Sequence, residues 1–395
     1  MSDHVAFFNI PAVGHVYPTL AIVSELVRRG HRVSYGSVEA RRSVIESAGA
    51  GLVGYETTRP KESDPAMVAP ERSVYLAQVM LDFIEETEHT LPQLEAAFAD
   101  DMPDVVVFDR MSFAGRIFAM EHKLPAVQLW PMLVSAEHWS LFRDYAPFDE
   151  SHPTFRAYAE KLDSLLRRHG LEMDTDDFLT SPPDARNISF CPRSFQFYGE
   201  RHDEKYTFVG PCPRPRDPVS RWSPPADGRP VLLISLGSIY NTLPGFFASC
   251  IAAFADSPWH VVLAVGERTD PASLGTLPAN IEAHQVVPQV EVLAHASVFL
   301  SQGGLGGIME ALSERVPLVV LPQTVEQESN ALRLRQLGLG RWLPADFTPE
   351  VLRSTVDEVA ADDQVSAALV AMRRDIEGAG GAAAAADVVE RLLRR

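Results

Sequence analysis

The chain has 395 residues, of which 46% are hydrophobic and 22% charged, and this composition is typical of a folded globular protein rather than a disordered one. At roughly 100–200 residues per domain, the length favours two domains. The 35 Lys and Arg residues against 53 Asp and Glu residues give a net charge of −18. This balance argues against nucleic-acid and anionic-membrane partners, because phosphate groups are bound by an excess of cations.

The cysteine content and the N-terminus predict a cytoplasmic protein. The three cysteines, Cys191, Cys212 and Cys250, include no C-x-x-C pair, which argues against a disulfide framework and a Cys-based zinc site. The first residues lack the cationic region of a signal peptide and are typical of a first β-strand. The longest uncharged run, Pro230 to Ala255, contains glycine and proline. It therefore predicts a strand, a turn and a helix rather than a membrane span.

The first half of the chain alternates apolar runs with amphipathic stretches. Val5–Ile10 is predicted to form a strand, Thr19–Arg29 a helix with apolar residues at helical spacing, and His31–Tyr35 the next strand. This order predicts a parallel sheet with helical crossovers. Asp104–Phe108 is almost entirely apolar, as expected for a strand that is buried on both faces.

The second half repeats this pattern after two interruptions. Charged helical segments such as Phe155–Gly170 predict an excursion from the first sheet, and the proline-rich stretch 211–230 predicts a linker. We therefore expect an α/β protein with two facing Rossmann-like domains: residues 1–210, a linker at 211–230, residues 231–380, and a C-terminal helix at 381–395. The strands predicted for the second domain are Val231–Leu236, Trp259–Val265, Ile281–His284, Val298–Ser301 and Leu318–Leu321.

Two residues at the carboxyl ends of predicted strands are candidates for acid–base chemistry. His15 lies in the predicted loop after the first strand, where Gly14 permits a tight backbone and Pro18 suits the first turn of a helix. A neutral imidazole there can take a proton from a hydroxyl near pH 7. Asp109 lies at the carboxyl end of the predicted strand Asp104–Phe108 and can hold such an imidazole in the useful tautomer. The alternatives are an ordinary loop histidine and a helix N-cap.

A glycine-rich segment in the second half is a candidate phosphate site. Gln302, Gly303, Gly304, Gly306 and Gly307 follow a predicted strand and lead into a helix, whose free N–H groups suit phosphate oxygens. Gly304-x-Gly306, with Glu326 about 20 residues further on, partly matches a dinucleotide fingerprint, so a dehydrogenase is an alternative. The Asp-x-Asp pattern at 174–177 lies in the charged excursion and is expected to be a solvated acidic loop rather than a metal site.

These motifs together resemble the family 1 glycosyltransferases of the GT-B fold, especially the bacterial macrolide and flavonoid glucosyltransferases that use UDP-sugars. The resemblance extends over nearly the whole chain. It is carried by Phe8-Asn9-Ile10-Pro11-Ala12 with Gly14-His15, Pro192-Arg193-Ser194-Phe195-Gln196, Phe208-Val209-Gly210-Pro211, Leu233 to Ser238, Val287-Pro288-Gln289, Gly303-Gly304, Met309-Glu310, Val316 to Gln323, and Glu326-Gln327.

The resemblance implies an inverting, metal-independent transfer with a UDP-sugar as co-substrate and no other cofactor. His15 would be the general base and Asp109 its partner. The donor would bind the C-terminal domain through Val286 on the uracil, the Val287 backbone, Glu310 on the ribose, Ser238 and the amides of Gly303, Gly304, Gly306 and Gly307 on the diphosphate, and Glu326 with Gln327 on the sugar.

The same resemblance assigns a hydrophobic small-molecule acceptor to the N-terminal domain. Aromatic and Met side chains in Tyr75–Ile84 and Trp130–Phe142, together with Phe178, suit such a molecule, although most of them also suit a hydrophobic core.

The sequence departs from the family pattern at Gln302. Relatives usually read His-Gly-Gly-x-Asn-Ser there, and this chain has Gln302-Gly303-Gly304-Leu305-Gly306-Gly307. Loss of charge-assisted bonds is expected to cost about 1–3 kcal/mol of diphosphate binding. The alternatives are therefore a transferase that uses a dTDP-deoxysugar, a UDP-sugar 2-epimerase, and a nucleotide-sugar or macrolide binding protein with little turnover. Gln327, which suits a donor with 3- and 4-hydroxyls, and His15 favour the glucosyltransferase.

Overall fold

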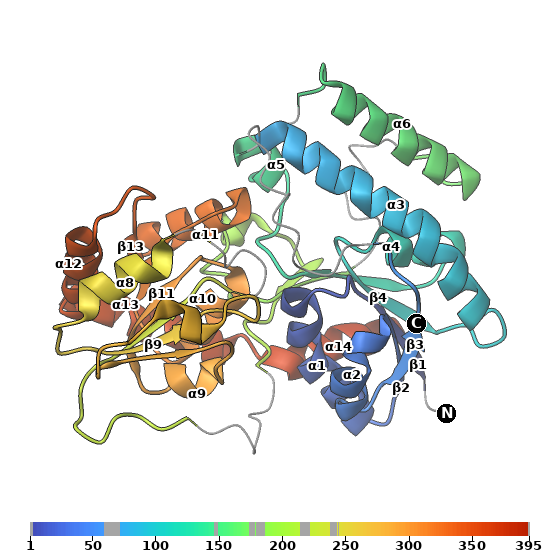
Figure 1. Ribbon diagram of the computed structural model, residues 1–395. Helices are drawn as coiled ribbons and strands as arrows, with labels where there is room; N and C mark the ends of the chain where they lie inside the picture. The colour runs from blue at the N-terminus through green and yellow to red at the C-terminus, as the bar shows by residue number, and fades with distance from the viewer. Residues whose placement is uncertain are drawn as a thin grey trace. The chain divides into compact units, whose positions relative to one another are not determined.

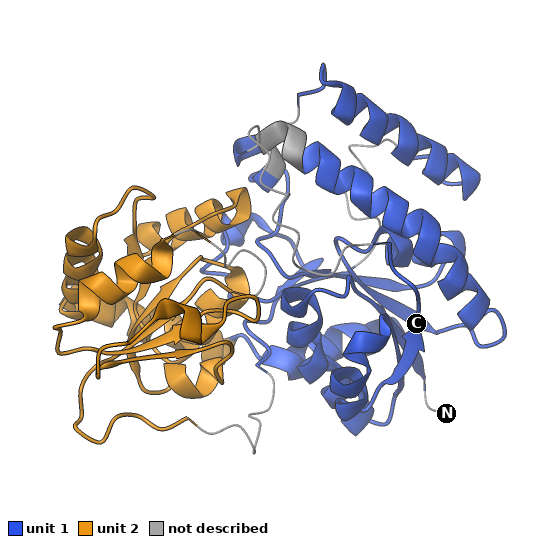
Figure 2. Ribbon diagram, in the orientation of Figure 1, with its two compact units in different colours: residues 1–214, 379–395 blue, residues 215–378 orange. Residues whose placement is uncertain are grey.

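The computed structural model describes residues 3–58, 72–145, 149–173, 178, 186–213, 222–237, 243 and 245–393, without the side chains of residues 72–75 and 142. The chain forms two compact units, residues 1–214 with 379–395 and residues 215–378 (Figure 2). The sequence assigned residues up to 380 to the second domain and treated 381–395 as a separate helix. In the structure this helix belongs to the first unit.

The first unit contains a sheet of seven parallel strands in the order β3-β2-β1-β4-β5-β6-β7. The order reverses between β1 and β4, which is the arrangement of a doubly wound sheet. The strands are β1 (His4–Phe8), β2 (Arg32–Ser37), β3 (Gly51–Gly54), β4 (Val105–Asp109), β5 (Ala126–Trp130), β6 (Arg186–Ser189) and β7 (Tyr206–Phe208).

Helices cover both faces of this sheet (Figure 1). On one face α14 (Gly381–Leu393) packs beside α1 (Val13–Arg28), and its apolar side chains, including Val388 and Val389, join the core around Phe7. On the other face α3 (Arg72–Phe98) packs beside α4 (Phe113–Glu121) and α6 (Pro153–Arg168), over a core around Phe8. Successive residues of β1 thus enter opposite cores, which explains its uninterrupted apolar sequence. The shorter helices are α2 (Arg42–Ser47) and α5 (Leu141–Tyr145).

The second unit repeats the same topology with six parallel strands in the order β10-β9-β8-β11-β12-β13. Its switch in strand order lies between β8 and β11. The strands are β8 (Val231–Ser235), β9 (His260–Ala264), β10 (Ile281–His284), β11 (Ala296–Ser301), β12 (Leu318–Val320) and β13 (Gly340–Trp342). The helices are α8 (Phe246–Phe254), α9 (Gln289–Leu293), α10 (Leu305–Ser313), α11 (Val325–Gln336), α12 (Pro349–Ala360) and α13 (Asp363–Gly378).

One predicted element is wrong at the place where it matters for function. The sequence placed His15 in a loop before a helix that begins at Thr19, whereas α1 begins at Val13. His15 therefore lies in the first turn of α1, and Pro18 lies inside the helix rather than at its start. Proline here leaves the carbonyl of Gly14 without the intrahelical hydrogen bond that an N–H group at position 18 would donate to it.

Candidate active site

The candidate residues of each unit follow the two strands at which the strand order reverses. In the first unit, His15 follows β1 and Asp109 ends β4. In the second unit, Gly237 follows β8 and Gln302 follows β11. Ligands of open α/β sheets bind at this point, outside the carboxyl ends of the strands. The topology therefore gives both units a position suited to binding a ligand.

The side chains of His15 and Asp109 are in direct contact. Nδ1 of His15 lies 2.5 Å from Oδ2 of Asp109, and the carboxylate is almost fully buried while the imidazole is 21% exposed. Oδ1 of Asp109 accepts a hydrogen bond of 2.7 Å from the backbone N–H of Met111, two residues further on. Both oxygens of Asp109 thus have partners that fix the carboxylate and the imidazole ring.

Two buried polar side chains, Tyr35 and Arg110, interact electrostatically with Asp109. Burial, together with the negative charge of Asp109, raises the pKa of Tyr35, whose hydroxyl shares a hydrogen bond of 2.8 Å with Thr19. Burial lowers the pKa of Arg110 to about 10, while the charge of Asp109 acts in the opposite direction. At neutral pH Tyr35 is therefore neutral and Arg110 is a cation, with its guanidinium 4.8 Å from the ring centre of Trp130.

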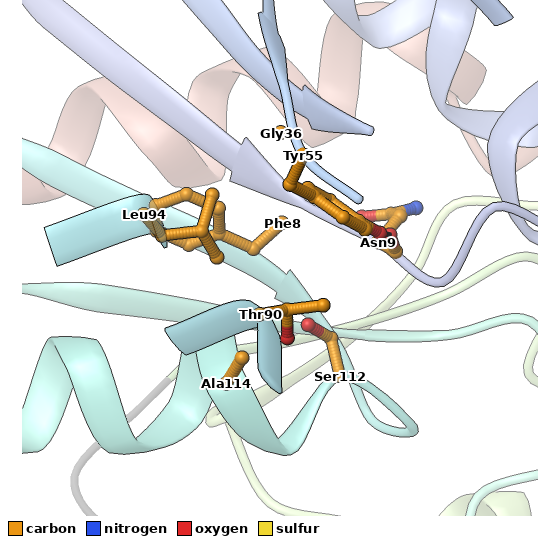
Figure 3. A pocket seen from close by; sticks show the side chains of 8 residues that line it. All are labelled: Phe8, Asn9, Gly36, Tyr55, Thr90, Leu94, Ser112 and Ala114. Atoms are coloured by element: carbon orange, nitrogen blue, oxygen red, sulfur yellow. Dashed lines mark hydrogen bonds between the residues drawn. The ribbon is translucent and has the colours of Figure 1, made fainter. Parts of the chain in front are cut away.

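A small pocket, with space for about one water molecule, lies at the ends of β1 and β2 on the face of the sheet that α3 and α4 cover (Figure 3). Apolar side chains and hydroxyls line it together with one amide; the lining residues are Phe8, Asn9, Gly36, Tyr55, Thr90, Leu94, Ser112 and Ala114. The aromatic and Met side chains that the sequence offered for an acceptor are largely core: Met80, Phe83, Trp130 and Phe178 are all buried. The side chains of Tyr75 and Phe142 lie outside the described part of the chain.

The glycine-rich segment of the second unit is part loop and part helix. Gly303 has a φ of +91°, and Gly304 is the N-cap of α10, so Gly306 and Gly307 lie in the first turn of the helix. Within the described residues, no side chain caps this turn. Its N–H groups therefore remain available to an anion, and the positive end of the helix dipole points in the same direction.

The backbone at Gly303 leaves no room for a side chain. A Cβ atom there would lie 2.6 Å from Cγ1 of Val320 and 3.3 Å from the carbonyl oxygen of Gln327. Nδ2 of Asn330, which is completely buried, donates a hydrogen bond of 3.0 Å to the Gly303 carbonyl. The loop is thus held from α11.

Gln302 packs against the backbone of Gly237, which has a φ of +76° and no room for a Cβ beside the Gln302 amide. Oε1 of Gln302 is buried and has no hydrogen-bond partner within the described residues. An amide at this position can supply one uncharged hydrogen bond where a histidine can supply a charged one.

The residues predicted to bind the nucleoside lie near the start of α9 and on α10. Oε2 of Glu310 accepts a hydrogen bond of 2.6 Å from Nε2 of Gln289, which the sequence analysis named in a motif but gave no role. Val286 is 67% exposed, and Val287 beside it is partly buried. An exposed apolar side chain of this size is available to a flat ring.

Glu326 and Gln327 lie in the first turn of α11, but they differ in what they can offer to a sugar. Oε1 of Gln327 accepts hydrogen bonds from the backbone N–H groups of Gln323 (2.7 Å) and Thr324 (3.2 Å) in a capping box. Its carbonyl is therefore used within the protein, and only its NH₂ group remains for a sugar hydroxyl. Glu326 is partly buried and accepts a bond of 3.4 Å from Asn330. The spacing Thr324-x-x-Gln327 is the sequence signal for this capping box.

Ser238 and the acidic pattern at 174–177 lie outside the described residues. Among those that are described, no three His, Cys, Asp or Glu side chains are grouped so that they can hold a metal ion. None of the described helices has the length and hydropathy that crossing a membrane requires.

Comparison with known proteins identifies the family. The C-terminal domain model of the erythromycin biosynthesis protein CIII-like family matches residues 249–393. The NDP-glycosyltransferase YjiC of Bacillus licheniformis is 39% identical over 99% of this chain and 98% of its own length. The demethyllactenocin mycarosyltransferase of Streptomyces fradiae is 37% identical over 99% of this chain and 86% of its own length.

The chain belongs to the family 1 glycosyltransferases. A solved structure, the glycosyltransferase of kitacinnamycin, is 35% identical and superimposes with a TM-score of 0.90 over 100% of both chains. The protein is therefore a glycosyltransferase of the GT-B fold, with two domains whose parallel sheets are flanked by helices.

Proposed function

We propose that this glycosyltransferase transfers glucose from UDP-glucose to a hydroxyl of a hydrophobic natural product such as a macrolide or a polyphenol, with inversion and without a metal ion. The observation that carries the proposal is the contact of 2.5 Å between Nδ1 of His15 and Oδ2 of Asp109. Because a carboxylate only accepts hydrogen bonds, the neutral ring carries its proton on Nδ1, and its basic lone pair is on Nε2.

In this mechanism Nε2 of His15 removes the proton of the acceptor hydroxyl. The hydroxyl oxygen attacks the anomeric carbon of the donor from the face opposite UDP, the bond from that carbon to the phosphate oxygen breaks, and UDP leaves with the electron pair. The negative charge of Asp109 stabilises the imidazolium that forms. The charge that develops on the diphosphate is stabilised by the N–H groups at the start of α10, which is why we expect no metal ion to be needed.

The names of the relatives support a natural-product acceptor. One relative is a demethyllactenocin mycarosyltransferase, another is an oleandomycin glycosyltransferase, and the solved structure above is the glycosyltransferase of kitacinnamycin.

A dTDP-deoxysugar is the second candidate donor, and one observation favours it. The carbonyl of Gln327 is used in the capping box of α11, so Gln327 can contact a sugar only through its NH₂ group. A sugar that lacks one hydroxyl loses less binding free energy at such a site than at a site where the whole amide is free to form hydrogen bonds. UDP-glucose remains our first choice because Glu326 and the NH₂ group of Gln327 together still provide an acceptor and a donor for adjacent hydroxyls.

The test is to incubate the protein with UDP-glucose or dTDP-glucose and a panel of macrolides and flavonoids in the presence of EDTA, and to detect a hexose mass increment together with release of the nucleoside diphosphate. We expect hexose transfer from UDP-glucose. His15→Ala should abolish transfer and leave the Kd for UDP unchanged. Transfer that survives in this variant would disprove the role of His15, and an absolute requirement for a divalent cation would disprove the metal-free mechanism.

A further inference from the structure

Asn9 is a buried residue that contacts His15 from the end of β1. It follows Phe8 at the end of β1 and is only 2% exposed. Its Nδ2 atom donates a hydrogen bond of 2.9 Å to the backbone carbonyl of His15. Since Phe8 and Phe108 are partners in the sheet register, Asn9 and Asp109 occupy equivalent positions on adjacent strands. His15 is therefore held from two strands, by Asn9 at its backbone and by Asp109 at its ring.

The first turn of α1 needs such support. Its N-cap, Ala12, provides no side-chain hydrogen bond, and Pro18 has no N–H group to donate to the carbonyl of Gly14. Besides Asn9, Arg41 holds this region by donating a bond of 2.9 Å from Nε to the carbonyl of Pro11. A carbonyl has two lone pairs, so that of His15 can accept the bond from Asn9 in addition to one within the helix.

The orientation of the Asn9 amide is fixed by this contact. Because the carbonyl of His15 can only accept, the atom facing it is nitrogen, and Oδ1 must point elsewhere. Oδ1 is buried and has no hydrogen-bond partner within the described residues. Figure 3 shows the Asn9 nitrogen directed away from the other side chains that line the pocket. A buried acceptor without a partner costs free energy, so it calls for a ligand that satisfies it.

The other polar groups of the pocket also present acceptors. The hydroxyl of Tyr55 donates a bond of 3.3 Å to the carbonyl of Asn9, and that of Thr90 donates one of 2.8 Å to the carbonyl of Glu86. Oγ of Ser112 accepts a bond of 3.3 Å from the N–H of Gly115. With the hydrogens of Tyr55 and Thr90 directed to the protein, a group that enters this pocket is bound best if it is itself a hydrogen-bond donor.

We propose that Asn9 is a positioning residue that couples acceptor binding to the base. Its Nδ2 atom holds the backbone of His15, and its Oδ1 atom accepts a hydrogen bond from one hydroxyl of the acceptor that reaches into the pocket. The proposal rests on the function proposed above, in which His15 is the general base. It predicts that the two ends of one amide affect different kinetic constants.

Two substitutions separate the role of Nδ2 of Asn9 from that of Oδ1. Asn9→Asp keeps an oxygen toward the pocket and replaces the NH₂ donor with an oxygen that repels the His15 carbonyl. We expect kcat to fall about 10- to 100-fold with the KM for the acceptor changed by less than about threefold. The added carboxylate should also raise the pKa of His15, so the acidic limb of the kcat profile should move to higher pH. Asn9→Leu removes both ends and should lower kcat and also raise the acceptor KM about tenfold or more.

The measurements use the full chain, saturating UDP-glucose and the best acceptor found in the panel, with folding checked by the melting temperature. The matched control is Asn280→Asp, because Nδ2 of this buried asparagine also donates to backbone carbonyls, those of Phe254 and Trp259, both at 2.9 Å, in the second unit. Its kcat should equal that of the wild type.

Three results would overturn the proposal while leaving the proposed function intact. The first is wild-type kcat in Asn9→Asp over the whole pH range. The second is an equal loss of kcat in Asn280→Asp, which would indicate a purely structural effect. The third is an unchanged acceptor KM in Asn9→Leu, which would remove the acceptor contact. Failure of the proposed function has a different signature, namely transfer that persists in His15→Ala.

Discussion

Nδ1 of His15 lies 2.5 Å from Oδ2 of Asp109, although 94 positions separate the two residues in the chain. The contact forms because the end of β4 and the start of α1 after β1 meet at the point where the strand order reverses. The buried carboxylate has a fixed orientation, since its second oxygen accepts from the N–H of Met111. A triad-like pair of this kind orients the ring and stabilises its charged form.

Replacing Asp109 by Asn tests this pair. The amide keeps the shape of the carboxylate but lacks its charge, and it can turn its NH₂ group toward the ring, which would then place the imidazole proton on Nε2. We expect kcat to fall by about 10²–10⁴-fold, since loss of the carboxylate in a comparable triad costs up to 10⁴. The Kd for UDP should stay at the wild-type value. A kcat within threefold of the wild type would show that Asp109 has no part in the transfer.

Gly303 and Gly306 provide a matched pair of substitutions in the diphosphate loop. Gly303→Ala introduces a Cβ close to Val320 at a φ of +91°, so we expect a loss of more than about 1 kcal/mol in stability and weaker UDP binding. Gly306→Ala lies inside α10, where a Cβ meets nothing within 4 Å, and should stabilise the helix by up to about 1 kcal/mol.

Calorimetric titration with UDP and thermal unfolding distinguish the two effects. If UDP contacts the N–H groups of this turn, Gly306→Ala should weaken UDP binding despite its gain in stability, because the new methyl group obstructs the approach of the phosphate. Unchanged UDP affinity in both variants would place the diphosphate somewhere other than at the start of α10.

Gln302→His restores the residue usual in the family. The imidazole can carry a positive charge near the diphosphate, and we expect UDP to bind about tenfold more tightly, equivalent to about 1.4 kcal/mol. The gain should increase as the pH is lowered, because only the charged imidazole provides it. Gln302→Leu is the opposite variant, and it should weaken UDP binding. An affinity that is the same in all three proteins would show that backbone amides alone bind the diphosphate.

The sequence was sufficient for those features that follow from local patterns. The apolar run Val231–Leu236 predicted a buried strand, which is β8, and the glycines at 303–307 marked the turn from β11 into α10. The pairing of His15 with Asp109 could be expected from their positions at the same sheet edge, but the distance between their side chains could not. Distances depend on strand register, which is set by packing over the whole sheet.

Two features that the sequence analysis missed depend on long-range packing, and a third is a local signal. The start of α1 was placed at Thr19 because the apolar residues at helical spacing begin there, and the support from Asn9 and Arg41 for the earlier start comes from outside the helix. The C-terminal helix joins the first unit because Val388 and Val389 complete a core that begins at β1. Gln327 was assigned only to the sugar, although its spacing from Thr324 also marks a capping box.

The contribution of α14 to the core of the first unit should be measurable as a loss of stability when one of its buried side chains is shortened. Val389 is completely buried between α14 and the core around Phe7, so Val389→Ala leaves a cavity and should cost about 2 kcal/mol. The exposed neighbour Asp387, changed to Ala, is the control, because its ion pair with Arg29 is at the surface and is expected to contribute less than about 1 kcal/mol. Urea denaturation compares the two variants, and equal losses would mean that α14 is not part of this core.

Glu282 provides a pH-dependent contribution to the stability of the second unit. Burial opposes its ionisation, but hydrogen bonds from Trp222, His284 and His260 outweigh burial and lower its pKa below the usual 4.5. A carboxyl whose pKa is lower in the folded state stabilises the fold fully above its unfolded pKa, and this contribution disappears as the pH falls through the folded pKa.

In the wild type, Nε1 of Trp222 donates a hydrogen bond of 2.7 Å to Glu282. Glu282→Gln keeps an oxygen for this bond but removes the charge. We expect the variant to be less stable than the wild type by about 1 kcal/mol at pH 7 and the difference to shrink below about pH 4.5, the ordinary pKa of a glutamate. Urea denaturation followed by tryptophan fluorescence at several pH values measures the difference, and Glu358→Gln on the exposed face of α12 is the control. A stability difference that stays constant from pH 7 to pH 3.5 would show that the charge of Glu282 does not stabilise the fold, and that only the shape of its side chain matters.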